Sequence, residues 1–317
     1  MVKRPVGRRP RYRAVMSLDD PVILTCSISG AVANRDQCPA IPYTPEEYAA
    51  ESRRIVDEGG VMIHIHARKA DGTPSYEVED FAAITNAIRA EVGDEVIINF
   101  STGTIGVPVA KRIAYLRECR PEVAALNMGS LNYAKYSRSR KAFVFDMVFA
   151  NPFTEIIELL EAMNELGIKP EHECFDVGHV GSLAPLIDMG VLRPPLHVDC
   201  VMGVVGGIPP SARNLAAMVD NIPPQDTASG PKSHWAVIGI SRDQWMLVGA
   251  ALSLGGSVRV GLEDNLYLPD GRMASSNGEL IAKARQMTED VGRRPATVSE
   301  ARSMLNVPAT PAVGSPA

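Results

Sequence analysis

Two histidines placed two residues apart could hold a metal ion. They lie in the run from Val61 to Arg68, which reads VMIHIHAR and follows Gly59-Gly60. Its β-branched alternation predicts a strand, and side chains two apart on a strand point to the same face. His64 and His66 therefore project together, and the pair needs a carboxylate or a third histidine to complete a metal site. The alternative is a pair of hydrogen-bonded core histidines at the end of a strand.

A suitable carboxylate occurs in the run from Val258 to Asn265, which reads VRVGLEDN. Arg259 and Glu263 share one face of the expected strand, whereas Val260 and Leu262 occupy the other. Large apolar residues suit a face that helices cover, so we expect Arg259 and Glu263 to point to the inside of the sheet. Charges buried there are costly unless they are paired or coordinate something. Two imidazoles and one carboxylate match a catalytic zinc site; the alternative is a buried ion-pair network without metal.

Small polar residues follow two other expected strands. Residues 99–104 read NFSTGT and residues 127–132 read NMGSLN. Hydroxyls and backbone amides that precede a helix suit a carboxylate or another anion. Each run alone could be an ordinary turn, but two of them around a metal favour a substrate site, with these candidate residues: Ser101, Thr102, Gly103, Asn127 and Ser130.

The strands that carry these residues alternate with helical patterns along the whole chain. We expect strands over 21–28, 61–68, 95–100, 122–126, 169–175, 196–202, 234–238 and 257–262, and helices over 44–58, 77–91, 107–118, 152–166, 180–189, 211–219, 242–254 and 276–291, with one long insertion over 127–150. Strict alternation implies a parallel sheet with right-handed crossovers. Eight units of each kind favour an α/β (β/α)8 TIM barrel, whose active site lies at the carboxyl ends of the strands.

A doubly wound sheet is the alternative architecture. It would carry a phosphate-binding G-x-G-x-x-G motif after its first strand, but residues 29–32 read SGAV. We therefore expect a single barrel domain over residues 21–305. A basic arm over residues 1–20 and a flexible tail over residues 306–317 flank it; the arm is expected to be a solvated tail, although it could bind an anion or clasp a second subunit.

Composition excludes several classes of protein. The chain has 317 residues, 45% of them apolar and 22% charged, with a net charge of −5. These values are typical of a soluble globular protein and do not indicate nucleic-acid binding. No apolar run is long enough to span a membrane. The five cysteines show no C-x-x-C pair, which suggests reduced thiols and a cytoplasmic location.

The ordered motifs resemble those of the β-keto acid cleavage enzymes, whose founding activity is 3-keto-5-aminohexanoate cleavage. The matching segments span roughly residues 21–305 and include LTCSISGA (24–31), IHIHAR (63–68), DGTPS (71–75), STG (101–103), LNMGSLNY (126–133) and VGLEDN (260–265). The resemblance implies a homotetrameric (β/α)8 barrel with a divalent metal, usually Zn²⁺, held by His64, His66 and Glu263. It also implies a reaction in which a β-keto acid and acetyl-CoA give acetoacetate and a new acyl-CoA.

The resemblance also assigns roles to residues around the metal. Arg259 and Asp264 would assist deprotonation, while Ser101 and Ser130 would hold the carboxylate and the carbonyl of the substrate. The founding type has a glutamate that pairs with the amino group of its substrate, where this chain has Val32. A buried valine cannot compensate an ammonium group. We therefore expect a substrate with an uncharged tail.

Two other functions use similar parts. Metal-dependent amidohydrolases are barrels with an H-x-H motif, but they place it on the first strand, whereas His64 and His66 fall on the second expected strand. Such a hydrolase would need no acetyl-CoA. A barrel that binds a keto acid or an acyl-CoA without turnover is the other alternative, but a sensor has no need of the Lewis acid that His64, His66 and Glu263 could hold.

Overall fold

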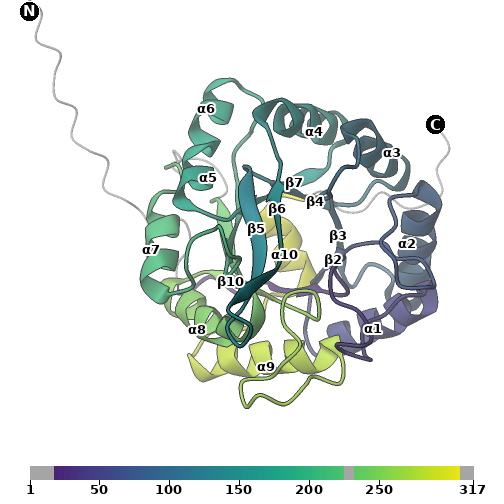
Figure 1. The fold of residues 1–317 in the computed structure, drawn as a ribbon. Helices are drawn as coiled ribbons and strands as arrows, with labels where there is room; N and C mark the ends of the chain where they lie inside the picture. The colour runs from purple at the N-terminus through teal and green to yellow at the C-terminus, as the bar shows by residue number, and fades with distance from the viewer. Residues whose placement is uncertain (1–17, 225–231, 308–317) are drawn as a thin grey trace, which may run out of the picture.

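The computed structural model describes residues 18–224 and 232–307 and shows a closed barrel of eight parallel strands (Figure 1). The strand order around the barrel is β1-β10-β9-β8-β7-β4-β3-β2. The strands are β1 (Leu24–Ser27), β2 (Met62–Ile65), β3 (Ile97–Ser101), β4 (Val123–Asn127), β7 (Lys169–Cys174), β8 (His197–Met202), β9 (His234–Gly239) and β10 (Ser257–Val260). The predicted (β/α)8 barrel is confirmed.

A ring of helices surrounds the strands. They are α1 (Pro45–Asp57), α2 (Val78–Val92), α3 (Val109–Cys119), α4 (Phe153–Leu166), α5 (Val177–Gly181), α6 (Leu183–Asp188), α7 (Ala212–Asp220), α8 (Gln244–Leu254) and α9 (Asn277–Asp290), with a 3-10 turn, η1 (Ser241–Asp243), before α8. The predicted start of α1 is confirmed, because the hydroxyl of Thr44 accepts a hydrogen bond from the Glu47 N–H in a capping box. The helix expected over 180–189 is wrong as one element and forms α5 and α6 instead. Pro185 falls in the first turn of α6, where its missing N–H costs little.

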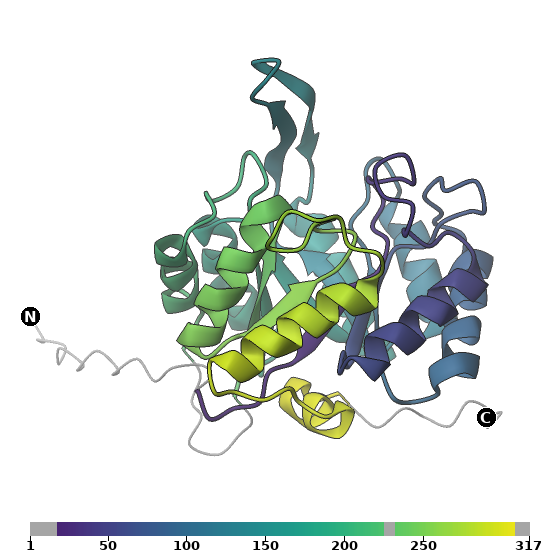
Figure 2. The same ribbon diagram turned by 90° about the horizontal axis from the view of Figure 1, so that it is seen from below.

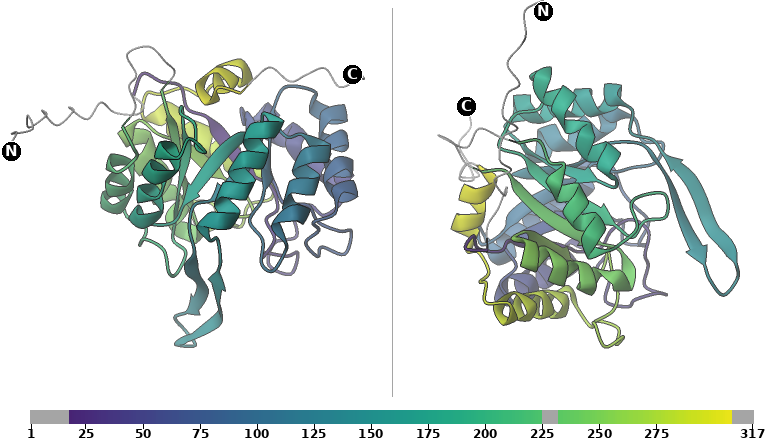
Figure 3. Two further views of the ribbon diagram at one scale, coloured as in Figure 1. Left: turned by 90° about the horizontal axis from the view of Figure 1, so that it is seen from above. Right: turned by 90° about the vertical axis from the view of Figure 1, so that its left-hand side faces the viewer.

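The insertion over 127–150 contains a β-hairpin that we did not predict. Strands β5 (Leu131–Ser137) and β6 (Ala142–Phe149) pair antiparallel, with a register shift between Lys135 and Tyr136. The hairpin projects from one end of the barrel (Figures 2 and 3). At its base, Leu131, Tyr133 and Phe149 pack on the cluster formed by Phe175, Val201, Val204 and Ile238. The hairpin therefore lies at the end of the barrel that carries the carboxyl ends of the strands, which is called the rim below.

The opposite end of the barrel is closed by a helix that the sequence reading missed, α10 (Val298–Leu305), as Figure 2 shows. Its Ala301 and Leu305 are buried in an apolar cluster with Ile23, Met62, Ile97 and Val123. Val307 belongs to the same cluster and is buried. The predicted start of the flexible tail, at residue 306, is therefore too early in the chain. The floor of the barrel below β1, β2, β3 and β4 is therefore apolar.

The terminal predictions fall mostly outside the described part of the chain. Residues 1–17 of the basic arm and residues 308–317 of the tail lie there, so both remain predictions. Asp20, at the end of the expected arm, accepts a hydrogen bond from Arg293 through its backbone oxygen. Within the described residues, no helix is both long enough and apolar enough to cross a membrane.

Leu305→Ala tests the importance of this floor. Leu305 is 1% exposed, and we expect its truncation to lower the free energy of unfolding by about 2–5 kcal/mol because it leaves a cavity. Urea unfolding followed by circular dichroism measures the change. Ser303→Ala, an exposed position on the same helix, is the control and should change stability by less than about 0.5 kcal/mol. An equal effect of the two substitutions would contradict the assignment of α10 to the core.

Candidate active site

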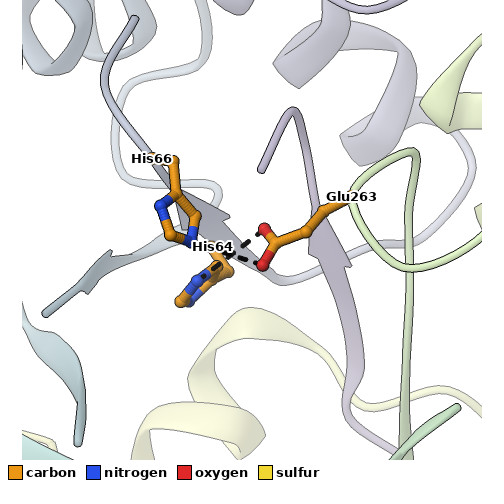
Figure 4. A group of neighbouring side chains, drawn as sticks. All are labelled: His64, His66 and Glu263. Carbon is orange, nitrogen blue, oxygen red and sulfur yellow. Dashed lines mark ion pairs between the residues drawn. The ribbon is translucent and has the colours of Figure 1, made fainter. Parts of the chain in front are cut away.

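The structure brings His64, His66 and Glu263 together at the mouth of the barrel (Figure 4). His64 lies on β2 and His66 directly follows that strand, while Glu263 follows β10. Nε2 of His66 lies 3.3 Å from one carboxylate oxygen of Glu263, and Nε2 of His64 lies 3.8 Å from the other. The His64 side chain is 1% exposed and that of His66 is 14% exposed, so the group opens to solvent on the His66 side.

Two glycines allow Glu263 to reach the histidines. Gly261 has a φ of +154°, and a Cβ there would lie 2.0 Å from the backbone oxygen of Ser27, so no side chain fits where β10 passes β1. Gly30 has a φ of +59°, and a Cβ on it would lie 2.6 Å from Cγ of Glu263. The loop after β1 therefore packs directly on the glutamate and fixes its position.

The three side chains fit a metal ion. Among the described residues, Nδ1 of His64 and Oε2 of Glu263 are buried and have no hydrogen-bond partner. Burial lowers the pKa of His64 well below its usual value, and the charge of Arg259 adds to that effect, so its imidazole is neutral and has a free lone pair. Burial alone would raise the pKa of Glu263, but its contacts with His66, Arg259 and His64 outweigh burial and keep that pKa low. Two imidazoles and a carboxylate are ligands that zinc prefers.

Arg259 links this group to further carboxylates inside the barrel. Its guanidinium donates to Asp264 through Nε at 3.0 Å, to Glu173 through Nη1 at 3.0 Å and to Glu263 through Nη2 at 2.9 Å. The Arg259 side chain is 2% exposed. The predicted inward orientation of Arg259 is confirmed. The buried ion-pair network that we considered as an alternative to the metal site is also present, and it shares Glu263 with the proposed ligands.

Asp264 and Glu173 have unusual proton affinities because they lie inside this network. Burial raises the pKa of Asp264 to about 6 and the pKa of Glu173 to about 7; the charge of Glu263 adds to both shifts and Arg259 opposes them. The hydroxyl of Ser27 also donates to Oδ2 of Asp264 at 2.5 Å. Carboxylates with pKa values near neutrality suit general acid–base work.

Sequence reading missed Glu171 and Glu173 on β7. Both are buried, at 0% and 8% exposure. Their spacing held the signal, because two acids two residues apart on an expected strand must share a face. His172 between them takes the opposite face and its ring contacts the backbone oxygen of His197 at 2.7 Å. A glutamate pair on a barrel strand therefore points either to the interior or to the surrounding helices. The contacts of Glu171 with Asn99 and of Glu173 with Arg259 show that this pair points to the interior.

The predicted substrate-site hydroxyls differ in whether their own protons are already used. Oγ of Ser101 accepts from the N–H of Gly103 at 3.2 Å, and Oγ of Ser130 accepts from the N–H of Asn151 at 2.7 Å, so each hydroxyl keeps its proton available for another acceptor. Thr102 differs, because its hydroxyl donates to the backbone oxygen of Ala125 and its side chain is only 1% exposed. The side chain of Thr102 therefore holds the turn, and the expectation that Thr102 belongs to the substrate site stays a prediction.

Asn127 and Gly103 are neighbours on this rim. A Cβ on Gly103 would lie 2.9 Å from Nδ2 of Asn127, so the glycine leaves room for the amide. The Asn127 side chain comes from the end of β4 and the residue is 4% exposed. The two residues stay candidates for substrate contact, with the side chain of Asn127 as the available donor.

Val32 is not buried as we expected. It is 69% exposed, in the loop that follows β1. The buried side chain beneath this loop is that of Arg68, which donates to the backbone oxygens of Ser29, Gly30 and Ala33 at 2.6–3.0 Å. The loop therefore holds its shape through a cation, while Val32 itself faces solvent.

Comparison with known proteins identifies the family. The sequence matches the beta-keto acid cleavage enzymes over residues 21–307. The chain belongs to this family. This membership fits the H-x-H motif on β2 and argues against an amidohydrolase, for which we expected that motif on the first strand.

Relatives within the family differ in the substrates that they are named for. The 3-keto-5-aminohexanoate cleavage enzyme of Fusobacterium nucleatum is 34% identical over 91% of this chain and 98% of its own. The 3,5-dioxohexanoate:acetyl-CoA acetone transferase of Paraburkholderia graminis is 34% identical over 92% of this chain and 97% of its own. The 3-oxoadipate:acetyl-CoA acetyltransferase of Cupriavidus necator is 31% identical over 92% and 96%.

Solved structures confirm the architecture alone. The apo structure of ObcA superposes with a TM-score of 0.69 at 21% identity and covers 85% of this chain, which spans 66% of that protein. The binary complex of ObcA with oxaloacetate superposes with a TM-score of 0.67 at 22% identity, over 85% of this chain and 68% of that one.

His66→Gln tests the metal site. The substitution removes one of three ligands while keeping a polar side chain, and we expect Zn²⁺ affinity at this site to fall by more than the roughly 10–100-fold that loss of an outer-sphere partner costs. Competition with a chromophoric chelator measures the affinity. His179→Gln is the matched control, because the ring nitrogens of His179 contact backbone groups of Phe175 and Ser130 and His179 is not in the group of His64, His66 and Glu263. Unchanged affinity in His66→Gln would rule His66 out as a ligand.

Proposed function

We propose that this protein catalyses metal-dependent cleavage of a β-keto acid with acetyl-CoA as co-substrate. The products are acetoacetate and a new acyl-CoA: the acetyl group moves onto the carboxylate-bearing carbon of the keto acid, and the remaining acyl group moves onto coenzyme A. The observation that carries the proposal is the convergence of His64, His66 and Glu263 with the Arg259–Asp264 pair in a chain that matches this family over its barrel.

His64, His66 and Glu263 would hold the metal, for which Zn²⁺ suits the ligand set best. Bound there, a divalent ion supplies Lewis acidity that makes the carbon between the carbonyl and carboxylate of a keto acid acidic. Glu263 contributes its position as well as its charge, since Nη2 of Arg259 holds one of its oxygens at 2.9 Å.

Asp264 is the residue that we assign as general base. Arg259 and Ser27 hold its carboxylate in one orientation, and a pKa of about 6 leaves it ionised at neutral pH while keeping appreciable proton affinity. It would take the proton from the acidic carbon, which would then attack the thioester carbonyl of acetyl-CoA and expel the thiolate of coenzyme A. That thiolate would add to the original keto carbonyl, the bond between this carbonyl and the acidic carbon would break, and the departing carbon would take the proton back to give acetoacetate. Arg259 would then balance the charge that moves between substrate and carboxylate.

Ser101 and Ser130 are the residues that we assign to the carboxylate and carbonyl oxygens of the substrate. Both hydroxyls accept a backbone N–H, so their own protons are free to point to a ligand. The side-chain amide of Asn127 lies beside Gly103 and Ser101 and would offer a further donor to the substrate carboxylate.

We further propose an uncharged substrate tail, a cytoplasmic enzyme and a homotetramer. The loop after β1 has no acidic side chain at position 32, and the buried guanidinium of Arg68 lies beneath it, which disfavours a cationic tail. The cysteines in the described part of the chain are free, as in a reducing compartment. The tetramer rests on the family resemblance.

The reaction itself is tested by acetoacetate release from a panel of β-keto acids with apolar, amino, quaternary ammonium and carboxylate tails. We expect turnover that requires both acetyl-CoA and metal, so a chelator should abolish it and Zn²⁺ should restore it. Release of acyl-CoA in equal amount is the matching readout. Hydrolysis of substrate without acetyl-CoA would overturn the proposal and favour a hydrolase.

Asp264→Asn tests the assignment of the base. The amide keeps the shape of the side chain but cannot take a proton, so we expect kcat to fall by about 10²–10⁴-fold. The metal content should stay unchanged, since Asp264 is not a proposed ligand. Ser27→Ala, which removes the hydrogen bonds of the Ser27 hydroxyl to this carboxylate and to the backbone oxygen of Val260, is the control and should have a much smaller effect. Equal losses in both variants would place Asp264 in a positioning role.

Val32→Glu tests the proposed specificity. Since position 32 is exposed, a new carboxylate should improve kcat/KM for a cationic-tail substrate only by the roughly two- to fivefold typical of an exposed ion pair. Kinetics with paired cationic and uncharged substrates measure the ratio. A wild-type preference for cationic tails would leave the cleavage reaction intact but contradict the role given to Val32.

A further inference from the structure

A second group of potential metal ligands lies deeper in the barrel, below the mouth. Glu171 on β7 and His197 and Asp199 on β8 offer one ligand atom each, and these atoms all lie within 4.8 Å of one another. The three residues are 0–1% exposed. None of them belongs to the proposed mouth ligands His64, His66 and Glu263.

The distances within this group suit a shared ion better than direct hydrogen bonds. Nε2 of His197 lies 3.2 Å from Oδ1 of Asp199 and 3.6 Å from Oε2 of Glu171. Zinc bonds of 2.0–2.1 Å in a tetrahedral site place neighbouring ligand atoms roughly 3.3 Å apart. Yet Nε2 and Nδ1 of His197 and Oδ1 of Asp199 form no hydrogen bond with any described residue. Nε2 of His197 and Oδ1 of Asp199 thus lie at ligand spacing, although neither atom has a hydrogen-bond partner among the described residues.

The surroundings of the group resemble an outer coordination sphere. Nδ2 of Asn99 donates to Oε2 of Glu171 at 2.8 Å and so fixes the orientation of that carboxylate. Outer partners of this kind commonly position metal ligands. Glu173 and Asp199 are register partners on the paired strands β7 and β8, which holds the ligand-bearing backbones together.

Charge is the second argument for an ion. Arg259 is the cation closest to Glu171, at 3.9 Å, but it already donates to three other carboxylates. One guanidinium and one divalent ion at the mouth supply three positive charges to an interior that holds five carboxyl groups, and a second divalent ion would raise the number of positive charges to five. These carboxylates are Glu171, Glu173, Asp199, Glu263 and Asp264. Buried carboxylates without a counter-charge are costly.

We propose that Glu171, His197 and Asp199 bind a second divalent transition-metal ion of the zinc type, enclosed in the barrel and distinct from the ion at the mouth. The ion would join β7 to β8. Because its ligands are shielded from solvent, it enters as the barrel forms and does not exchange through the mouth, where the His66 and Glu263 side chains are 14% and 18% exposed. A proton on Glu171 with enclosed water molecules is the competing solution.

Metal analysis of the full-length protein tests this proposal with Zn²⁺ as the probe. The protein is produced with excess Zn²⁺, dialysed against a strong chelator, and its zinc per chain is measured before and after dialysis. We expect two ions per chain to fall to one, since the chelator removes only the ion at the mouth. His66→Gln should keep the chelator-resistant ion, whereas His197→Gln and Asp199→Asn should lose it.

His234→Gln is the matched control. His234 is 2% exposed and its ring lies 4.8 Å from that of His197, but it is not one of the converging ligands. This variant should retain the resistant ion. Wild-type protein that holds no zinc after dialysis, or a resistant ion that His197→Gln and Asp199→Asn retain, would overturn the proposal and favour the protonated, hydrated cluster.

A second measurement needs no variant. When dialysed wild-type protein unfolds in urea beside a chromophoric chelator, zinc should appear with the same time course as the loss of circular dichroism. Absence of zinc release on complete unfolding would contradict the second site. Both outcomes are independent of catalysis, so a failure here leaves the proposed reaction untouched, and an inactive enzyme leaves this site untouched.

Discussion

The buried guanidinium of Arg259 is the interaction on which the rest of the site depends. It joins Asp264, Glu173 and Glu263, which come from two different parts of the barrel, and it is almost completely excluded from water. A lysine would present a single point charge, whereas the planar guanidinium donates in several directions at once. Without it, three buried carboxylates would repel one another. One residue thus sets the position of a proposed metal ligand and of the proposed base together.

Apolar packing and the charged side chains of the candidate site lie at different heights along the barrel axis. Ile23, just before β1, and apolar side chains from β2, β3 and β4 meet α10 at the floor, while the charged groups of the candidate site lie nearer the carboxyl ends of the strands. The apolar floor and the helices that cover the strands stabilise the fold through burial. The interior above the floor can therefore carry charges that lower stability, which is the usual arrangement at functional sites. Figure 2 shows the floor helix and the hairpin at opposite ends of the molecule.

Periodicity predicted the barrel and the convergence of His64, His66 and Glu263, because strand alternation fixes which side chains face inward. The same rule places Glu171 and Glu173 on one face of their strand. Sequence alone does not tell whether that face is buried or exposed to solvent, because this depends on the closure of the barrel. The hairpin β5–β6 and the helix α10 were missed because both depend on tertiary contacts, with the rim cluster at Phe175 and with the floor. The exposure of Val32 was equally invisible, since it depends on how the backbone around Arg68 folds.

Chemistry and specificity occupy different kinds of structure in this protein. The groups assigned to metal binding and proton transfer come from strands or their immediate ends and are held by several buried contacts each. Val32, the residue assigned to the substrate tail, lies in an exposed loop whose shape is set by hydrogen bonds from Arg68 to backbone oxygens. Because those bonds do not involve the side chain at position 32, that side chain can change without altering the loop or the carboxylate network. Relatives of similar identity that are named for amino, oxo and carboxylate substrates are consistent with such a division. A new preference for the substrate tail would therefore require only a change at an exposed position. A change of the reaction would instead require changes among buried charged side chains.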